Sequence, residues 1–240
     1  MDTIFSVLKN TWDQICADFY ANFIDGDGWL LMLKGLGVTF QITIFALIIG
    51  IVIGFLVAIV RSTYDKTGKM RVLNAICRLY LTVIRGTPVV VQLLIIYYVI
   101  FASVSIDKTI VAILSFGINS GAYVAEIVRG GIMSIDEGQF EAGRSLGFSY
   151  ASTMWYIITP QAFKNILPAL ANEMIALLKE TSVAGYIALN DLTRAGYTIR
   201  SRTFSAYMPL LAVAAIYLIV VVILTKLVGI LERRLRTDER

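Results

Sequence analysis

The chain has 240 residues, of which 58% are hydrophobic and 16% are charged, and its net charge is +4. A soluble domain is usually about one-quarter charged, so this composition predicts an all-α, multi-span membrane protein with no nucleic-acid partner. Histidine is absent and the two cysteines are Cys16 and Cys77, which argues against a metal site, a catalytic nucleophile and a structural disulfide.

Residues 1–28 are expected to form an amphipathic helix, because apolar side chains recur at helical spacing between polar ones. Such a helix either lies in the membrane interface or packs against the bundle, and both alternatives stay open. This segment has no basic n-region and no small-residue cleavage site, so we expect no cleaved signal peptide. The apolar positions are Ile4, Phe5, Leu8, Trp12, Ile15, Phe19 and Phe23.

Five apolar segments between residues 29 and 231 predict five membrane spans. In the first, Gly50 and Gly54 are four residues apart, which favours close approach of another helix. The prolines Pro168 and Pro209 are expected in the first turn of the last two spans, where their missing N–H costs little. The predicted spans are residues 36–60, 72–101, 109–128, 168–187 and 206–231.

The second span is too long for one straight crossing and contains Arg85-Gly86-Thr87-Pro88. Proline removes a backbone donor and disfavours helix in the residue before it. We therefore expect two half-helices, residues 72–84 and 89–101, within one span.

Lysine and arginine in the loops predict the orientation. Twelve of them fall on one side, four in the basic tail 232–240, against six on the other side. The richer face is expected to be cytoplasmic, with the N-terminus outside and the C-terminus inside. The polar insert 130–161 then lies in the cytoplasm.

This insert is expected to contain two short helices joined at a glycine. Ser134 followed by Glu137 is a capping-box pattern for the first helix. Gly147 suits the left-handed residue that ends it. Ser149 is a candidate cap for the second helix, which we expect to end near Pro160. A plain linker between two spans would be shorter and less apolar, so we interpret the insert as a docking element.

The insert resembles the cytoplasmic signature of ABC importer permeases, which is Glu-Ala-Ala, three residues, Gly, nine residues, then Ile-any-Leu-Pro. Here Glu141-Ala142-Gly143 is followed by Gly147 and by Ile157-Ile158-Thr159-Pro160 at the same spacing. The chain departs from the pattern at Gly143 and Thr159. Together with Arg85–Pro88 and Gly138-Gln139-Phe140, these residues are similar to the polar-amino-acid subfamily, and the resemblance runs from about Gly35 to Leu231.

The resemblance implies a coupling helix that docks into an ATP-binding subunit, with contributions from Glu141, Ala142, Gly143, Gly147 and Pro160. It implies two copies of that subunit, which hold the ATP and magnesium, since this chain has no phosphate-binding loop and is not itself an enzyme. It also implies an extracytoplasmic substrate-binding protein and a second permease. That permease is either the same chain, in the homodimer that we expect, or a different chain in a heterodimer. The location implied is the cytoplasmic membrane of a prokaryote.

Charged residues inside the spans must face protein or water, because each costs about 2.5–3.5 kcal/mol or more at the centre of the bilayer. Helix rise places Arg85, Asn119 and Glu180 near the middle of the membrane. A broken helix with polar groups at that depth is a recurring substrate site. The residues expected to line the translocation path are Arg85, Thr87, Gln92, Ser115, Asn119, Tyr123, Glu180, Thr181 and Ser182.

An equal alternative is an Arg85–Glu180 salt bridge that only holds spans together. Glu126 and Arg129 are three residues apart on one helix, so we interpret them as a structural pair. The predicted function is import of polar amino acids, and the acidic residues in the spans favour basic ones. The alternatives are an ion-driven secondary transporter and an ABC permease for another small solute.

Overall fold

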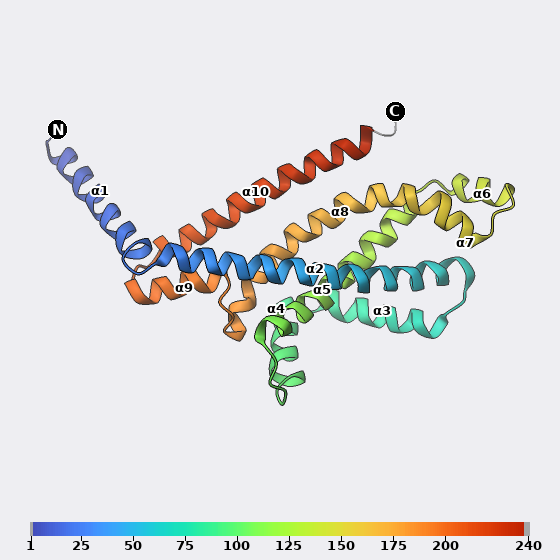
Figure 1. Ribbon diagram of the computed structural model, residues 1–240, viewed down its shortest axis with the longest axis horizontal. Helices are drawn as coiled ribbons and strands as arrows, with labels where there is room; N and C mark the ends of the chain where they lie inside the picture. Colours follow the sequence, from blue (N-terminus) through green and yellow to red (C-terminus); the bar gives the residue numbers. More distant parts are fainter. Residues whose placement is uncertain (1, 238–240) are drawn as a thin grey trace.

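The computed structural model describes the backbone of residues 2–237 and the side chains of residues 10–235. The described backbone forms helices joined by short turns, and the bundle is elongated along α2 (Figure 1). The elements are α1 (Asp2–Phe23), α2 (Gly28–Thr67), α3 (Arg71–Gly86), α4 (Val89–Ile95), η1 (Ile96–Ile100), α5 (Lys108–Met133), α6 (Glu137–Ser145), α7 (Tyr150–Thr153), η2 (Met154–Ile158), α8 (Thr159–Glu180), η3 (Thr181–Ile187), α9 (Leu192–Thr203) and α10 (Met208–Thr237).

The helices α2 and α5 cross closely because glycine replaces a side chain at each contact. A Cβ atom on Gly54 would lie 2.5 Å from Val124 Cγ1, and one on Gly50 would lie 2.9 Å from Ser120 Oγ. From the other side, a Cβ on Gly117 would lie 2.8 Å from Ile49. The prediction that Gly50 and Gly54 allow close approach is therefore confirmed.

The expected break at Gly86-Thr87-Pro88 is confirmed, and it is sharp. Thr87 is extended, with φ −125° and ψ 147°, as the residue before a proline prefers to be. The chain bends by 109° between α3 and the continuous α4–η1 segment. The two halves therefore do not continue along one axis, and α4 projects from the bundle in Figure 1.

The prediction that a helix ends near Pro160 is wrong. The helix that begins at Tyr150 continues through the π-helical η2 and then through α8 to Glu180. In η2 the bonding shifts by one residue, so that Thr159 N–H bonds to Met154 O. We attribute the tolerance of Pro160 to this π segment, which loosens the ladder before it. Pro168 consequently lies inside α8, and not in its first turn as expected.

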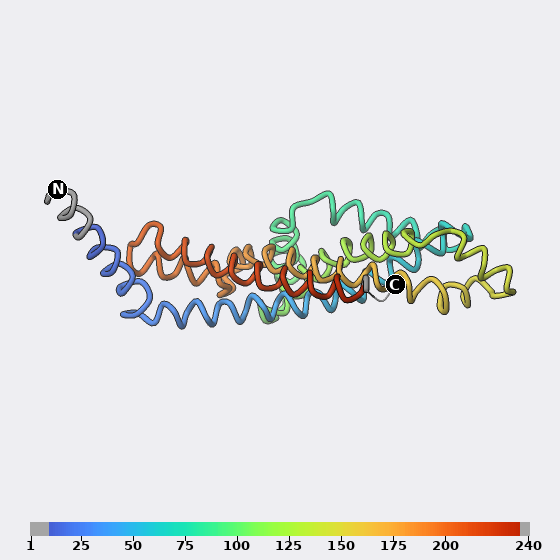
Figure 2. The backbone as a smooth tube through the Cα atoms, turned by 90° about the horizontal axis from the view of Figure 1, so that it is seen from above, coloured from blue at the N-terminus to red at the C-terminus, as the bar shows by residue number. Residues whose placement is uncertain are grey.

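The last helices place the termini. Pro209 is in the first turn of α10, as predicted. α10 packs on α9 and α8, and the end of α1 packs on α9 and α10 through Asn22 and Phe23. Residues 10–20 of α1 extend away from the bundle (Figure 2). The side chains of Ile4, Phe5 and Leu8 lie outside the described residues.

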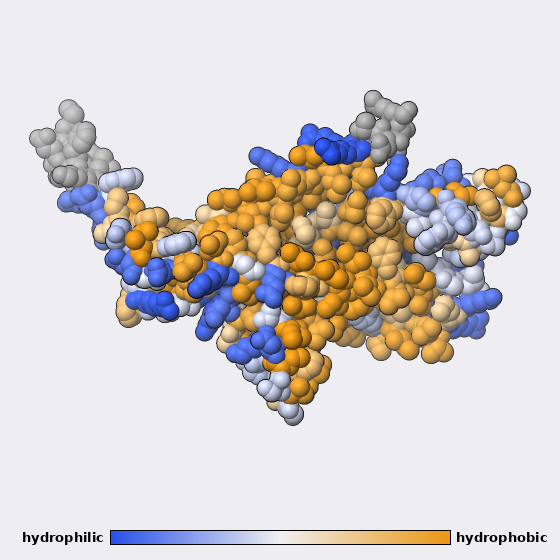
Figure 3. All heavy atoms as spheres, viewed as in Figure 1, coloured by the Kyte–Doolittle hydropathy of each residue, from blue (hydrophilic) through white to orange (hydrophobic). Residues whose placement is uncertain are grey.

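Three described helices, α2, α5 and α10, are long and apolar enough to cross a membrane, or four spans if α3 and α4–η1 count as one. α8 has 22 residues but carries charged side chains, among them Glu173 and Glu180. Figure 3 shows apolar residues over the middle of the visible face and polar residues toward both ends of the long axis.

Candidate functional site

The first part of the site is the break between α3 and α4, and a side chain stabilises it. Nε2 of Gln92 lies 2.7 Å from the carbonyl oxygen of Ile84, 3.1 Å from that of Thr87 and 2.8 Å from Thr87 Oγ1. Carbonyls at the end of a helix have no partner within it. Gln92 therefore supplies donors where α3 stops.

The second part is α5, which reaches the break through Asn119. Nδ2 of Asn119 donates to Oε1 of Gln92 at 2.9 Å, so Thr87, Gln92 and Asn119 form one hydrogen-bonded chain. Asn119 is buried, and its Oδ1 has no partner in the described structure. Ser115 is also buried, but its hydroxyl donates to Val111 O of its own helix.

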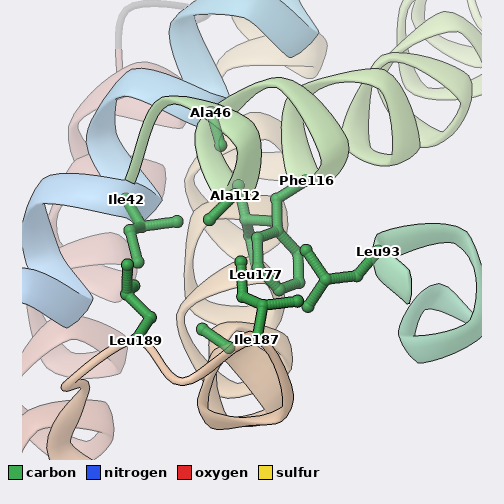
Figure 4. Close-up of a cluster of buried hydrophobic side chains, with 9 residues drawn as sticks. Ile42, Ala46, Leu93, Ala112, Phe116, Leu177, Ile187 and Leu189 are labelled. Carbon is green, nitrogen blue, oxygen red and sulfur yellow. The ribbon is translucent and has the colours of Figure 1, made fainter. Parts of the chain in front are cut away.

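The third part is the end of α8, which changes to the 3₁₀ helix η3 at Thr181. Leu93, Phe116, Leu177 and Ile187 meet in one apolar cluster, so α4, α5, α8 and η3 converge there (Figure 4). This cluster positions the polar residues on each element around it.

The side chains of this third part differ in their surroundings. Thr181 is buried, and its hydroxyl donates to Leu178 O. Glu180 is partly buried and has no ion pair with the other described residues. Ser182 lies in a hollow of about 470 Å³ that also has Tyr186, Arg194 and Tyr197 in its wall.

Arg85 does not pair with Glu180, so that alternative is wrong. Its Nη1 lies 3.4 Å from Glu126 Oε1, and its guanidinium lies over the Tyr123 ring at 5.8 Å. Depth along a helix gives no direction around it, so the partner of Arg85 could not be found from the sequence. The expected Glu126–Arg129 pair is present at 3.9 Å.

The sequence interpretation also missed a polar contact between α5 and α8. Ser120 Oγ donates to Glu173 Oε1 at 2.8 Å, which joins α5 to α8 beside Asn119. Glu173 and Glu180 are seven residues apart on α8, which places them on one face of the helix. This spacing of seven residues could have indicated from the sequence that a second acidic side chain lies on the same face of α8 as Glu180.

The insert has the expected two helices, but the cap of the first differs. Asp136 Oδ1 accepts from Gly138 N–H at 2.7 Å and caps α6, while Ser134 donates to Gly131 O at the end of α5. The capping box from Ser134 to Glu137 is therefore wrong, because aspartate takes the cap nearer the helix. Ser149 accepts from Ser152 N–H and caps α7, as predicted.

The turn between α6 and α7 also matches expectation. Gly147 has φ +84°, the left-handed conformation that favours glycine. Gly143 is buried and packs closely against α7, since a Cβ there would lie 2.7 Å from Thr153 Cγ2. Glu141 and Ala142 remain exposed, so the outer face of α6 is open.

Large apolar side chains are exposed around this insert. Leu146, Trp155 and Tyr156 are 76%, 70% and 69% exposed, and Phe148 is 43% exposed. A contiguous exposed apolar patch commonly marks a protein–protein interface. The neighbouring Tyr150 is less exposed, and burial raises the pKa of its phenol while the nearby Lys66 opposes the rise. Tyr150 is therefore neutral at physiological pH.

Within the part of the chain that the structure describes, no group of three or more histidine, cysteine, aspartate or glutamate side chains could hold a metal ion. The geometry brings polar side chains together at a broken helix and exposes the insert at one end of the bundle.

Comparison with known proteins agrees with this geometry. Residues 47–237 match the family described as "Binding-protein-dependent transport system inner membrane component". The arginine transport system permease protein ArtQ of Bacillus subtilis is 37% identical over 87% of this chain and 94% of that one. The glutamine transport system permease protein GlnP of Escherichia coli is 38% identical over 86% and 93%.

Solved structures share the fold. The crystal structure of an amino acid ABC transporter with histidines has a TM-score of 0.79 and 40% identity, and the match covers 85% of this chain and 94% of that chain. An inward-facing structure of the MetNI methionine ABC transporter has a TM-score of 0.72 at 19% identity, which shows the fold alone, over 86% and 97% of the two chains. This chain therefore belongs to the family of binding-protein-dependent transport system inner membrane components.

Proposed function

We propose that this chain is the membrane subunit of an ATP-driven ABC importer that moves polar amino acids into the cytoplasm. The observation that carries the proposal is the exposed α6 element, which is followed by the turn at Gly147 and presents Glu141 and Ala142 outward. A secondary transporter would need no such element. Arginine and glutamine permeases among the relatives support an amino-acid substrate.

The substrate path in this proposal follows the α3–α4 break. An amino acid presents a carboxylate and an ammonium group, so it needs donors at one end and acceptors at the other. Arg85 supplies donors, and it is partly exposed beside Tyr123. Glu180 supplies an acceptor that has no ion-pair partner in the described part of the chain. The Thr87–Gln92–Asn119 chain holds the break in shape between them.

The acceptor side favours basic amino acids. Glu173 lies on the Glu180 face of α8 and would add a second carboxylate to the path. Glu180→Gln is therefore expected to raise the KM for arginine and lysine more than the KM for glutamine. An equal change for all three substrates would contradict a charge-selective role for Glu180.

The proposed topology has five spans, with α8 as the fourth. α8 is less apolar than the other proposed spans because it carries charged side chains, which are tolerated where they face the path. The N-terminus lies outside and the C-terminus inside, so α6 and α7 are cytoplasmic. The proposed assembly has two permeases, two ATP-binding subunits that hold ATP and magnesium, and an extracytoplasmic binding protein.

Reconstitution of this chain with its ATP-binding subunit tests the proposal. We expect amino-acid uptake into liposomes that requires ATP. Glu141→Arg should abolish uptake, either because ATP hydrolysis continues without transport or because the ATP-binding subunit no longer docks on this chain. Gln139→Arg is the matched control, because positions two apart lie on different faces of the helix. Uptake driven by an ion gradient without the ATP-binding subunit would reject the proposal in favour of a secondary transporter.

A further inference from the structure

Ion pairs connect the α3–α4 break to α6 over a long distance in the chain. Arg85 at the break pairs with Glu126, Glu126 pairs with Arg129, and Arg129 pairs with Asp65 near the end of α2. The next residue, Lys66, pairs with Glu137 in the first turn of α6. We call these six residues, Arg85, Glu126, Arg129, Asp65, Lys66 and Glu137, the charge chain.

The atoms used in the charge chain show that its middle members bridge two partners at once. Glu126 offers Oε1 to Arg85 at 3.4 Å and Oε2 to Arg129 at 3.9 Å. Arg129 in turn uses Nε toward Glu126 and Nη1 toward Asp65, which is 3.1 Å away. Glu126 therefore joins α5 to α3, and Arg129 joins α5 to α2. A shift of either side chain changes both of its contacts.

At the far end, Lys66 fixes α6 in two ways. Its Nζ lies 3.1 Å from Glu137 Oε1 and 4.8 Å from the centre of the Phe140 ring. Glu137 and Phe140 are both in α6. Lys66 therefore contacts successive turns of the element that the proposed function assigns to the ATP-binding subunit.

Apolar packing does not fill the space around this end. A hollow of about 560 Å³ separates the end of α2 from the insert, and Asp65, Lys66, Arg129 and Glu137 are in its wall. At this hollow, ion pairs join α2 to α6 through Lys66 and Glu137, and α2 to α5 through Asp65 and Arg129. An isolated exposed ion pair contributes little, whereas several pairs in a network are the case in which such contacts matter.

We propose that the charge chain transmits displacement of α6 to the α3–α4 break, with Glu126 as its central positioning residue. This inference rests on the proposed function for its biological meaning. Coupling between distant sites requires an element with two discrete arrangements that both sites bias. We assign this role to Glu126, because its two carboxylate oxygens face two different arginines, Arg85 and Arg129.

The first test separates a coupling role from a structural one. Glu126→Gln keeps the size of the side chain and removes its charge. We expect uptake to fall roughly 2- to 30-fold, the range of measured couplings of this kind, while ATP hydrolysis persists. The number of ATP molecules used for each amino acid transported then rises. Loss of folded protein alone would lower both rates in proportion and leave that ratio unchanged, which would overturn the proposal.

The second test uses charge exchange at the α6 end. Lys66→Glu and Glu137→Lys should each raise the same ratio, and the double variant should restore most of it because the pair is re-formed. Lys69→Glu is the matched control, since Lys69 lies three residues further on, in the turn after α2, and has no ion pair among the described residues. Additive damage in the double variant would contradict a linked pair.

A third measurement does not depend on transport. A cysteine placed at Gly86, where an added Cβ meets open space, reports on the break after Cys16 and Cys77 have been replaced by serine. In the full chain in liposomes, Glu137→Lys should change the maleimide labelling rate at position 86 by roughly 2- to 30-fold, and Lys66→Glu in the double variant should reverse the change.

The labelling result distinguishes the two levels of inference. An altered rate at position 86 without ATP-driven uptake in the unmodified protein would reject the proposed function and retain the physical link. An unchanged rate at position 86, with normal ATP-driven uptake, would reject the link and retain the proposed function.

Discussion

The side-chain amide of Asn119 donates a 2.9 Å hydrogen bond to the side-chain oxygen of Gln92, and this contact joins α5 to the bend between α3 and α4. Gln92 uses both ends of its side-chain amide: the oxygen accepts from Asn119, and the nitrogen lies within hydrogen-bonding distance of Ile84 O and Thr87 O. Proline opens the helix at this point, and Gln92 determines what the freed carbonyls contact. The bend is thus held by a side chain that is itself held by another span.

Gln92→Leu is expected to destabilise the protein by about 1–3 kcal/mol, because it leaves the buried side-chain amide of Asn119 without its acceptor and removes the donor to Ile84 O and Thr87 O. The variant should melt at a lower temperature in detergent and should transport less even where it is folded. Gln41→Leu is the control, since Gln41 is exposed on α2. Equal melting temperatures for the two variants would show that the Gln92 bonds do not stabilise the bend.

Gly54→Val is expected to separate α2 from α5. Its Cβ would lie 2.5 Å from Val124 Cγ1 and 2.9 Å from the backbone nitrogen of Ala125, and backbone cannot move aside cheaply. Overpacking of this kind costs about 1–3 kcal/mol. Gly37→Val on the same helix is the control, because nothing lies within 4 Å of its added Cβ. The comparison is made by thermal unfolding in detergent, and a smaller effect at Gly54 than at Gly37 would contradict the crossing.

The features that the sequence predicted correctly are local or periodic. Pro88 interrupts a helix whatever the surrounding fold. The four-residue spacing of Gly50 and Gly54 predicts close contact with another helix but does not identify that helix. Gly147 and Ser149 likewise act through their own backbone. These features placed the bend, the α2 crossing and the turn of the insert before the fold was known.

The features that were missed depend on direction and competition. The sequence predicts a similar membrane depth for Arg85 and Glu180, but not the direction in which each side chain points. In the structure Arg85 pairs with Glu126. Ser134 and Asp136 both suit a helix cap, and the aspartate lies next to the first helical residue. Pro160 matched a stop signal, but a π segment before it allowed the helix to continue. Sequence patterns alone cannot rank such alternatives.

Gly147→Ala is expected to cost about 1–2 kcal/mol in the insert, because φ of +84° crowds a Cβ against the following carbonyl. The loss should appear as faster hydrogen exchange in α6 and α7 and as weaker binding of the ATP-binding subunit. Gly130→Ala is the control with the opposite expected sign, since Gly130 is helical and an added Cβ there meets open space. A neutral Gly147→Ala would mean that the turn does not need its left-handed residue.

Two aspartates that cap helices outside the spans are expected to give opposite pH dependence. Burial raises the pKa of Asp191 above its usual 3.8, against the bonds it accepts from Arg194 N–H and Thr193 N–H. The folded state therefore holds that proton more tightly than the unfolded state, and stability should fall as pH rises from 3.8 through the raised pKa. Asp191→Asn should remove this slope from the melting temperature.

Asp107 is the comparison, because hydrogen bonds from Thr109 lower its pKa and the side chain is exposed. Its contribution is present above 3.8 and is lost as pH falls through the lowered pKa, so its slope has the opposite sign. The difference in melting temperature between the unmodified protein and Asp191→Asn should therefore shrink or reverse with rising pH, whereas the difference for Asp107→Asn should grow. Slopes of the same sign for both variants would mean that burial does not control the charge of Asp191.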